Sequence, residues 1–183
     1  IVTTEFDKTV TRGFTAEVVS DISERHEAGT GIDFYADQVN SYAFDKNIQS
    51  LEVTAKRGLY PDNARMSSVA IYHRQSWKLK RWQLEGGIRA NMFWLNMEEQ
   101  QFGDVNLSPS ALVGNFSAIY HFENNWKLAT SISTAFRAPN INDLGSFGKF
   151  DFGIEVPTRS LEPEKSFNKE ISLKKINQRL LFS

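Results

Sequence analysis

The chain has 183 residues, of which 21 are basic and 22 acidic, so its net charge of −1 gives no overall field that would favour nucleic acid or an anionic membrane surface. The apolar share of 40% is ordinary for a folded protein and allows a sizeable core. Cysteine is absent, which excludes disulfide frameworks, thiolate zinc sites and cysteine nucleophiles.

Apolar and polar residues alternate along most of the chain, which is the period of a β-strand. No apolar run approaches the roughly 18 residues of a membrane helix, but membrane strands give a much weaker hydropathy signal. Seven or eight strands result when one near residues 1–10 is counted. In chain order the others are expected at residues 14–22, 30–43, 69–79, 82–95, 112–122, 126–137 and 166–174.

The alternation is clearest in residues 82–95, where the even positions carry no charge and the odd positions are mostly polar. Trp82 and Trp94 stand at the two ends of the uncharged face, while Arg89 and Asn91 lie on the other. The following strands continue the uncharged face. We expect one face to hold Trp82, Leu84, Ile88, Met92, Trp94, Leu112, Phe116, Tyr120, Leu128 and Ile132.

The connections between these strands alternate in length. Residues 80–81 and 123–125 form tight turns that keep the apolar positions on one face. Residues 44–67, 96–110 and 138–165 are long and polar. Short turns at one end and long loops at the other are typical of an outer-membrane barrel.

Two architectures fit a period of two, and a soluble sandwich is the commoner one. Three features favour a membrane barrel instead. Several strands have 11 to 14 residues, aromatic residues end the uncharged faces, and the opposite faces are polar as in a wet lumen. We therefore expect an all-β fold, an antiparallel meander of long strands that forms part of a transmembrane β-barrel.

Two linked motifs carry a resemblance to a known family. Phe136-Arg137-Ala138-Pro139 ends one strand, and Pro139 lacks the N–H that a further ladder bond needs. The second motif, in residues 161–166, contains Leu161, Pro163 and Glu164 and opens the next strand. With the hairpins before them, these motifs resemble TonB-dependent outer-membrane receptors over most of residues 14–175.

The resemblance implies a receptor of the bacterial outer membrane that imports a scarce nutrient such as a siderophore, another metal complex or a cofactor. Its implied partners are membrane lipid, the small-molecule nutrient and the TonB energy-coupling protein, which acts through a plug region; nucleic acid is not among them. Residues 1–183 contain no plug-like segment, begin at Ile1 without a signal peptide, and have too few strands for the family's barrel of about 22. We expect a partial barrel domain, with plug and remaining strands absent.

The ligand of such a receptor would meet the lumen face and the long loops. Arg89 and Asn91 on the lumen face, and Arg137 and Asn140 at the external rim, are the expected ligand-binding residues. An alternative for Arg137 is an ion pair with a carboxylate such as Glu164 or Glu170.

No metal site is expected, because His26, His73 and His121 lack the spacing of metal ligands. The resemblance also argues against haem, since residues 140–160 contain no His between the two motifs, where haem-transporting members of the family carry one. We expect no resident cofactor.

No catalytic residues are expected either, because no nucleophile motif occurs and nothing supplies an apolar pocket for a pair of carboxylates. Glu98 and Glu99, like Asp33 and Asp37, are expected to be loop or lumen charges. The alternatives to a receptor are a soluble β-sheet ligand-binding module and, with less support, an outer-membrane barrel enzyme.

Overall fold

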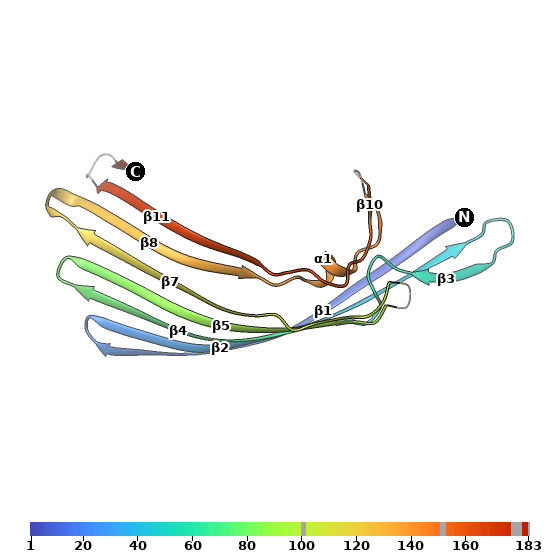
Figure 1. Cartoon of the computed structure of the whole chain (residues 1–183), viewed down its shortest axis with the longest axis horizontal. Coiled ribbons are helices and arrows are strands. Elements are labelled where there is room, and N and C mark those ends of the chain that lie inside the picture. The colour runs from blue at the N-terminus through green and yellow to red at the C-terminus, as the bar shows by residue number, and fades with distance from the viewer. Residues whose placement is uncertain (100–101, 151–152, 177–180, 183) are drawn as a thin grey trace.

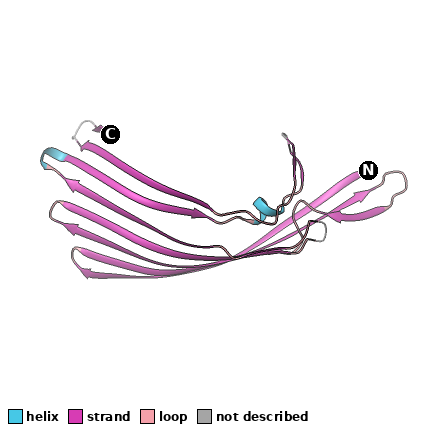
Figure 2. Ribbon diagram, in the orientation of Figure 1, coloured by secondary structure: helices cyan, strands magenta, loops and turns pink. Residues whose placement is uncertain are grey.

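The computed structural model describes residues 1–99, 102–150, 153–176 and 181–182. Most of them are extended strand (Figures 1 and 2). The helical elements among them are the 3-10 turn η1 (Glu123–Asn125) and the short helix α1 (Ile141–Gly145). The strands are β1 (Val2–Ser23), β2 (His26–Lys46), β3 (Val53–Arg57), β4 (Ala64–Leu79), β5 (Trp82–Met97), β6 (Val105–Leu107), β7 (Ser110–His121), β8 (Trp126–Arg137), β9 (Gly148–Phe150), β10 (Gly153–Glu155), β11 (Glu164–Ile176) and β12 (Leu181–Phe182).

One curved sheet contains the long strands in the order β1-β2-β4-β5-β7-β8-β11-β12, with every neighbouring pair antiparallel (Figure 1). Strand β3 adds to β2 and β6 adds to β5, while β9 and β10 form a separate hairpin. Chain order and spatial order therefore agree along the path of long strands. The expectation of an all-β antiparallel meander is confirmed.

Strand β1 is longer than the sequence indicated. Residues 1–10 and 14–22 suggested two pieces, but they form one strand that pairs with β2 without interruption through Gly13. A glycine inside a strand usually weakens it because it offers no side chain to pack. Here the ring of Tyr35, directly opposite, lies over Gly13 at a distance that leaves no room for a Cβ atom. The neighbouring tyrosine covers the gap, so the strand continues.

The tight turns lie together at one end of the sheet, at the left of Figure 1. Lys80 and Arg81 join β4 to β5 as expected, and η1 joins β7 to β8. Asn124 and Asn125 adopt positive φ values of 59° and 63°, which asparagine tolerates better than most residues. Both expected turns are confirmed.

The register confirms which residues share a face. Trp82 lies opposite Tyr120, and Phe116 lies opposite Ile132, so apolar positions of successive strands stand side by side. This outward face is largely exposed, with Ile88 60% accessible. The opposite face, called inner below, carries most of the polar residues of these strands.

The long connections lie at the other end of the sheet and are shorter than predicted, at residues 47–63, 98–109 and 138–163. The largest difference is at the start of β4, which was expected at residue 69 and begins at Ala64. Residues 64–68 lack apolar alternation on the outward side, so their pattern resembles a loop. They are strand because they pair with β2, Ala64 lying opposite Val39 and Arg65 opposite Gln38.

Candidate ligand site at the loop end of the sheet

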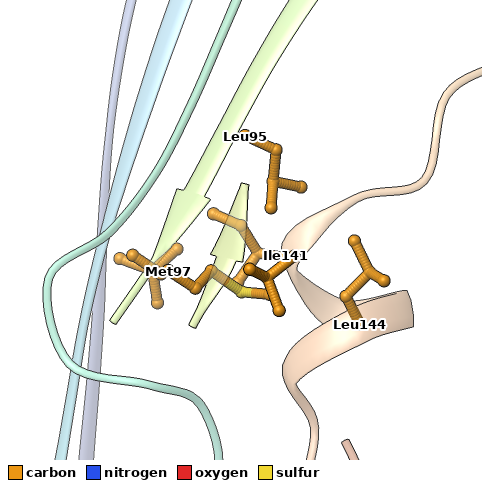
Figure 3. Packing of buried hydrophobic residues seen from close by; sticks show 7 residues of the cluster. Leu95, Met97, Ile141 and Leu144 are labelled. Carbon is orange, nitrogen blue, oxygen red and sulfur yellow. The ribbon is translucent and has the colours of Figure 1, made fainter. Parts of the chain in front are cut away.

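The apolar core of the described residues lies at the loop end, on the inner face. Leu95 and Met97 of β5 meet Ile141 and Leu144 of α1 there (Figure 3). Leu95 is 1% exposed and Leu144 is fully buried. The remaining members of the cluster are Val39, Ala64 and Val105. The last loop is therefore folded back onto the inner wall, where the odd positions of β5 change from polar to apolar.

Helix α1 begins with a capping box that fixes its position. The side chain of Asn140 accepts the N–H of Asp143 at 2.9 Å, and a carboxylate oxygen of Asp143 accepts the N–H of Asn140 at 3.1 Å. Pro139 precedes the cap and keeps the residue before it extended. These local bonds let five residues form a helix that is too short to be stable without packing.

Arg57, the last residue of β3, connects all three loops. Its Nε donates to Glu99 at 2.5 Å, one terminal nitrogen donates to the carbonyls of Gly58 and Leu59 at 2.9 Å, and the other to the carbonyl of Gly145 at 2.7 Å. The side chains of Arg57 and Glu99 are only 15% and 8% exposed. A guanidinium suits this position because its planar fork offers several donors in fixed directions.

Aromatic contacts surround the same guanidinium. Its carbon lies 5.9 Å from the ring centre of Phe102 and 5.6 Å from that of Phe147. Nearby, the Tyr60 hydroxyl donates to the side-chain oxygen of Asn142 in α1 at 3.0 Å. Burial is the main cause that raises the pKa of Tyr60 above its ordinary value, so this hydroxyl keeps its proton.

Arg137 ends β8 beside the other side of α1. Its two terminal nitrogens bind Glu164 and Asp143, each at 2.8 Å. Glu164 lies directly opposite Arg137 in the register, so the two sequence motifs meet where the pairing of β8 and β11 begins. The ion pair with Glu164 is the predicted alternative for Arg137, whereas Glu170 lies farther along, opposite Ser131.

A hollow of about 380 Å³ lies over this side of α1. Its lining combines one guanidinium with several carboxylates and a few apolar side chains. The lining residues are Arg137, Pro139, Asn142, Asp143, Ser146, Glu155, Val156, Leu161 and Glu164. The hollow could contact a polar ligand through charge-assisted hydrogen bonds and through apolar surface at once.

Arg89 and Asn91 lie elsewhere, on the inner wall of β5. Arg89 donates to Asn91 at 2.8 Å and to Asp33 of β2 at 2.5 Å, and its guanidinium carbon is 5.5 Å from the ring centre of Tyr72. Asp33 is thus a lumen charge, as expected from the sequence, and Glu99 is a loop charge.

The structure therefore divides the predicted ligand-binding residues into two pairs. Arg137 and Asn140 meet around Asp143, while Arg89 and Asn91 bind each other on the wall. Arg137 lines the hollow at the loop end, and ligand contact by any of the four stays a prediction. Of the motif residues, Pro139, Leu161 and Glu164 also line it, and Ala138 is buried beside α1. The ring of Phe136 lies 5.8 Å from that of Phe93 in β5, and Pro163 directly precedes β11.

Sequence reasoning missed Arg57, Glu99 as its partner, and the helix. The Asn140-to-Asp143 spacing is a capping signal that could have indicated α1. Arg57 and Glu99 are 42 positions apart, and no local pattern connects them.

The described residues hold no group of three or more His, Asp or Glu side chains arranged to bind a metal ion. Neither helical element there is long and apolar enough to cross a membrane.

Comparison with protein families matches residues 3–183 to the model described as "TonB dependent receptor-like, beta-barrel". Comparison with curated protein sequences finds no match. Since the family model covers nearly the whole chain, the match concerns the sheet and the loop end together.

Solved structures with a similar fold include three transporters or receptors. The copper transporter OprC has a TM-score of 0.78 at 14% identity, and the match covers 96% of this chain and 28% of that one. An FrpB iron transporter from Neisseria meningitidis has a TM-score of 0.67 at 19% identity, and the match covers 94% of this chain and 27% of that one. The third is the Serratia marcescens hemophore receptor HasR, a double mutant solved with HasA and heme. It has a TM-score of 0.72 at 17% identity, and the match covers 98% of this chain and 31% of that one. The chain thus spans less than a third of the length of each.

Proposed function

Because this chain belongs to the TonB-dependent receptor β-barrel family, we propose that the whole protein imports a scarce nutrient, and specifically a metal complex such as a ferric siderophore. The protein is located in the bacterial outer membrane, where the barrels of this family lie. The family consists of receptors and transporters, and we propose that the protein is likewise not an enzyme.

The hollow over α1 is the observation that carries the proposal. It is lined by the last long connection and the strand ends that flank it, at the loop end of the sheet. In barrels of this kind the long loops face the outside. Loops on a rigid scaffold can vary without disturbing the fold, which suits a site that must recognise one nutrient among many. Arg137 and the apolar Leu161 both line the hollow, so a ligand could be held by charge and by contact.

A metal complex is favoured over haem and over an organic cofactor. The lining contains Arg137, Asp143 and Glu164, whose charges suit a polar, hydrophilic complex. Residues 140–160 contain no His, the side chain that would be expected to bind haem iron. The neighbours named as copper, iron and hemophore receptors share the fold, and their cargoes differ from one another.

The remaining parts of the transport machine are also part of this proposal. Residues 1–183 would be one segment of the barrel, with a plug and further strands completing it. Energy would reach the receptor from the TonB protein through that plug. No nucleic acid partner and no resident cofactor are proposed.

A soluble ligand-binding module does not fit a sheet whose apolar face is open. Ile71, Ile88 and Leu112 on the outward face are 58%, 60% and 73% exposed. In a sandwich these side chains would pack against a second sheet, whereas in a barrel they meet lipid.

Deleting the gene in the producing bacterium tests the proposal. Growth would be followed under iron or copper limitation with individual ferric siderophores, haem or copper as the only source. We expect one ferric siderophore to stop supporting growth, and the intact gene to restore it. A variant with Arg137→Gln should restore growth only weakly and bind that siderophore less tightly. Equal use of every source by the deletion strain would contradict metal-complex import.

A further inference from the structure

The outward face of β1, β2, β4 and β5 changes character toward the loop end. Phe14, Phe34, Val69 and Met92 stand side by side as directly opposed partners and form an apolar row. One step farther toward the loops, the next row contains a cation, two small residues and an aromatic ring. That row is Arg12, Ala36, Ser67 and Trp94.

The small residues leave a hollow of about 400 Å³ on this face. Ala36 and Ser67 lie at its centre, between Arg12 on one side and Trp94 on the other. Arg65 lines it from the following row, together with Gln38 and Asn96. The hollow therefore has an aromatic ring at one edge, polar side chains on its loop-end side and two guanidinium groups.

Asn63 holds two of the side chains on the loop-end side of the hollow, those of Gln38 and Arg65. This residue adopts a positive φ of 58° in the loop before β4. Its side-chain oxygen accepts hydrogen bonds from Gln38 at 2.8 Å and from two nitrogens of Arg65 at 3.3 and 3.4 Å. Arg65 is thus tethered by a neutral group, and its charge is not neutralised by that contact.

The two charged side chains on the outward face of the hollow, those of Arg12 and Arg65, are both positive. In the part of the chain that the structure describes, neither Arg12 nor Arg65 makes an ion pair, whereas Arg74, Arg89 and Arg137 all do. The outward positions of the four strands in and beyond these rows carry no acidic residue. Asp37 also lines the hollow but belongs to the inner face of β2, and the carboxylate of Asp62 accepts the side-chain N–H of Asn40, farther toward the loops, at 3.2 Å. Unpaired guanidinium groups with several free donors suit the oxygens of a phosphate.

The hollow lies at the level of the outer lipid headgroups. Trp82 and Trp94 mark the two aromatic ends of β5, and the strand between them would extend for about 40 Å at ~3.3 Å per residue. A tilt of about 40° reduces this to roughly 30 Å across the membrane, which matches the apolar band with its aromatic girdles. Arg12 and Arg65 therefore lie just outside the hydrocarbon, next to its outer boundary.

We propose that this hollow is a binding site for a phosphorylated lipid of the outer leaflet. The phosphate binds between Arg12 and Arg65, and the acyl chains run along the apolar row of Phe14, Phe34 and Met92. Basic pockets on the wall of a membrane protein bind anionic headgroups in this way. The site depends on the location of the chain in the outer membrane and is independent of the nutrient that the receptor imports.

Lipid binding to the full-length receptor tests the proposal. The receptor would be purified in a neutral detergent, and its affinity for lipid A, which carries phosphate and acyl chains, would be measured by native mass spectrometry. The paired change Arg12→Gln and Arg65→Gln should weaken binding roughly 30-fold, since each cation near a charged surface contributes a little more than about fivefold. Dephosphorylated lipid A should bind the unmodified receptor about as weakly.

The matched control is Arg81→Gln, which removes an exposed arginine from a turn at the opposite end of the sheet. This variant should bind lipid A as the unmodified receptor does. Inorganic phosphate at the same concentration should not displace lipid A; displacement would reduce the site to a phosphate site and overturn the lipid assignment. A photoreactive lipid A should label residues 10–14, 34–38, 65–69 or 92–96. Labelling elsewhere, or unchanged affinity in the paired variant, would also overturn the proposal.

Discussion

Lys56 and Arg57 are neighbours in β3, yet their ion pairs lie in different environments. Lys56 binds Asp45 at 2.9 Å with side chains 41% and 32% exposed. Arg57 binds Glu99 with side chains 15% and 8% exposed and also holds three carbonyls. An exposed pair is screened by water and contributes little, whereas a buried charge that loses its partner is costly.

Arg57→Met should therefore loosen the loop end. The change removes the guanidinium beside the buried carboxylate of Glu99, and the Gly58 and Gly145 carbonyls lose the donors that it supplies, whereas the Leu59 carbonyl keeps the N–H of Phe147. The expected cost is about 3–5 kcal/mol. Hydrogen exchange of the full-length receptor should show faster exchange in residues 47–63 and 138–149, with the strands near the tight turns unchanged. Lys56→Met is the matched control, with a cost within about 1 kcal/mol. Equal exchange in the two variants would show that Arg57 does not hold the loops.

Alternate residues of β5 lie on opposite faces of the sheet, which gives a second prediction for single residues. Ile88 is on the outward face and Asn91 on the inner face. Ile88→Arg places a charge near the middle of the hydrocarbon and should cost about 2–4 kcal/mol, while Asn91→Arg should cost much less. Refolding of the full-length receptor into lipid bilayers measures both. Equal costs would refute the assigned faces.

At the scale of elements, α1 depends on its cap. Asn140→Ala removes the acceptor for the Asp143 N–H and should destabilise the docked helix by about 1 kcal/mol. Asn140→Ser keeps an acceptor at this position and should be close to neutral. The local opening free energy of residues 141–145, again from hydrogen exchange, distinguishes them. A neutral Asn140→Ala would mean that packing of Leu144 alone holds the helix.

Strands with a regular alternation could be predicted from sequence because each residue's face depends only on its parity. Residues 82–95 illustrate this, since lipid on one side and a polar lumen on the other impose the pattern at every position. The beginning of β4 could not, because residues 64–68 are strand through their partners in β2. The candidate site was harder still. Arg137 pairs with Glu164 because the two residues lie opposite each other on adjoining strands. Arg57 and Glu99 meet only because two long loops fold together, and no local sequence pattern predicts that contact.

At the scale of the whole molecule, the described sheet is a single curved layer with its core confined to the loop end (Figure 1). Its outward face carries large exposed side chains, and within the described residues β1 pairs along only one of its edges. Open strand edges and large apolar patches both favour association. Outer-membrane lipid and neighbouring barrel strands would relieve these liabilities in the intact receptor.

We therefore expect residues 1–183, made alone, to need detergent or to associate. Pairing of open edges would satisfy backbone N–H and C=O groups, and contact between outward faces would remove Ile88, Leu112 and their neighbours from water. Light scattering in detergent-free buffer should report oligomers or larger species, and a neutral detergent should reduce them to small complexes. A stable monomer at high concentration without detergent would require the outward face to be buried within one chain. That burial needs a second layer packed on the sheet, which is the geometry of a soluble module and not of a barrel wall.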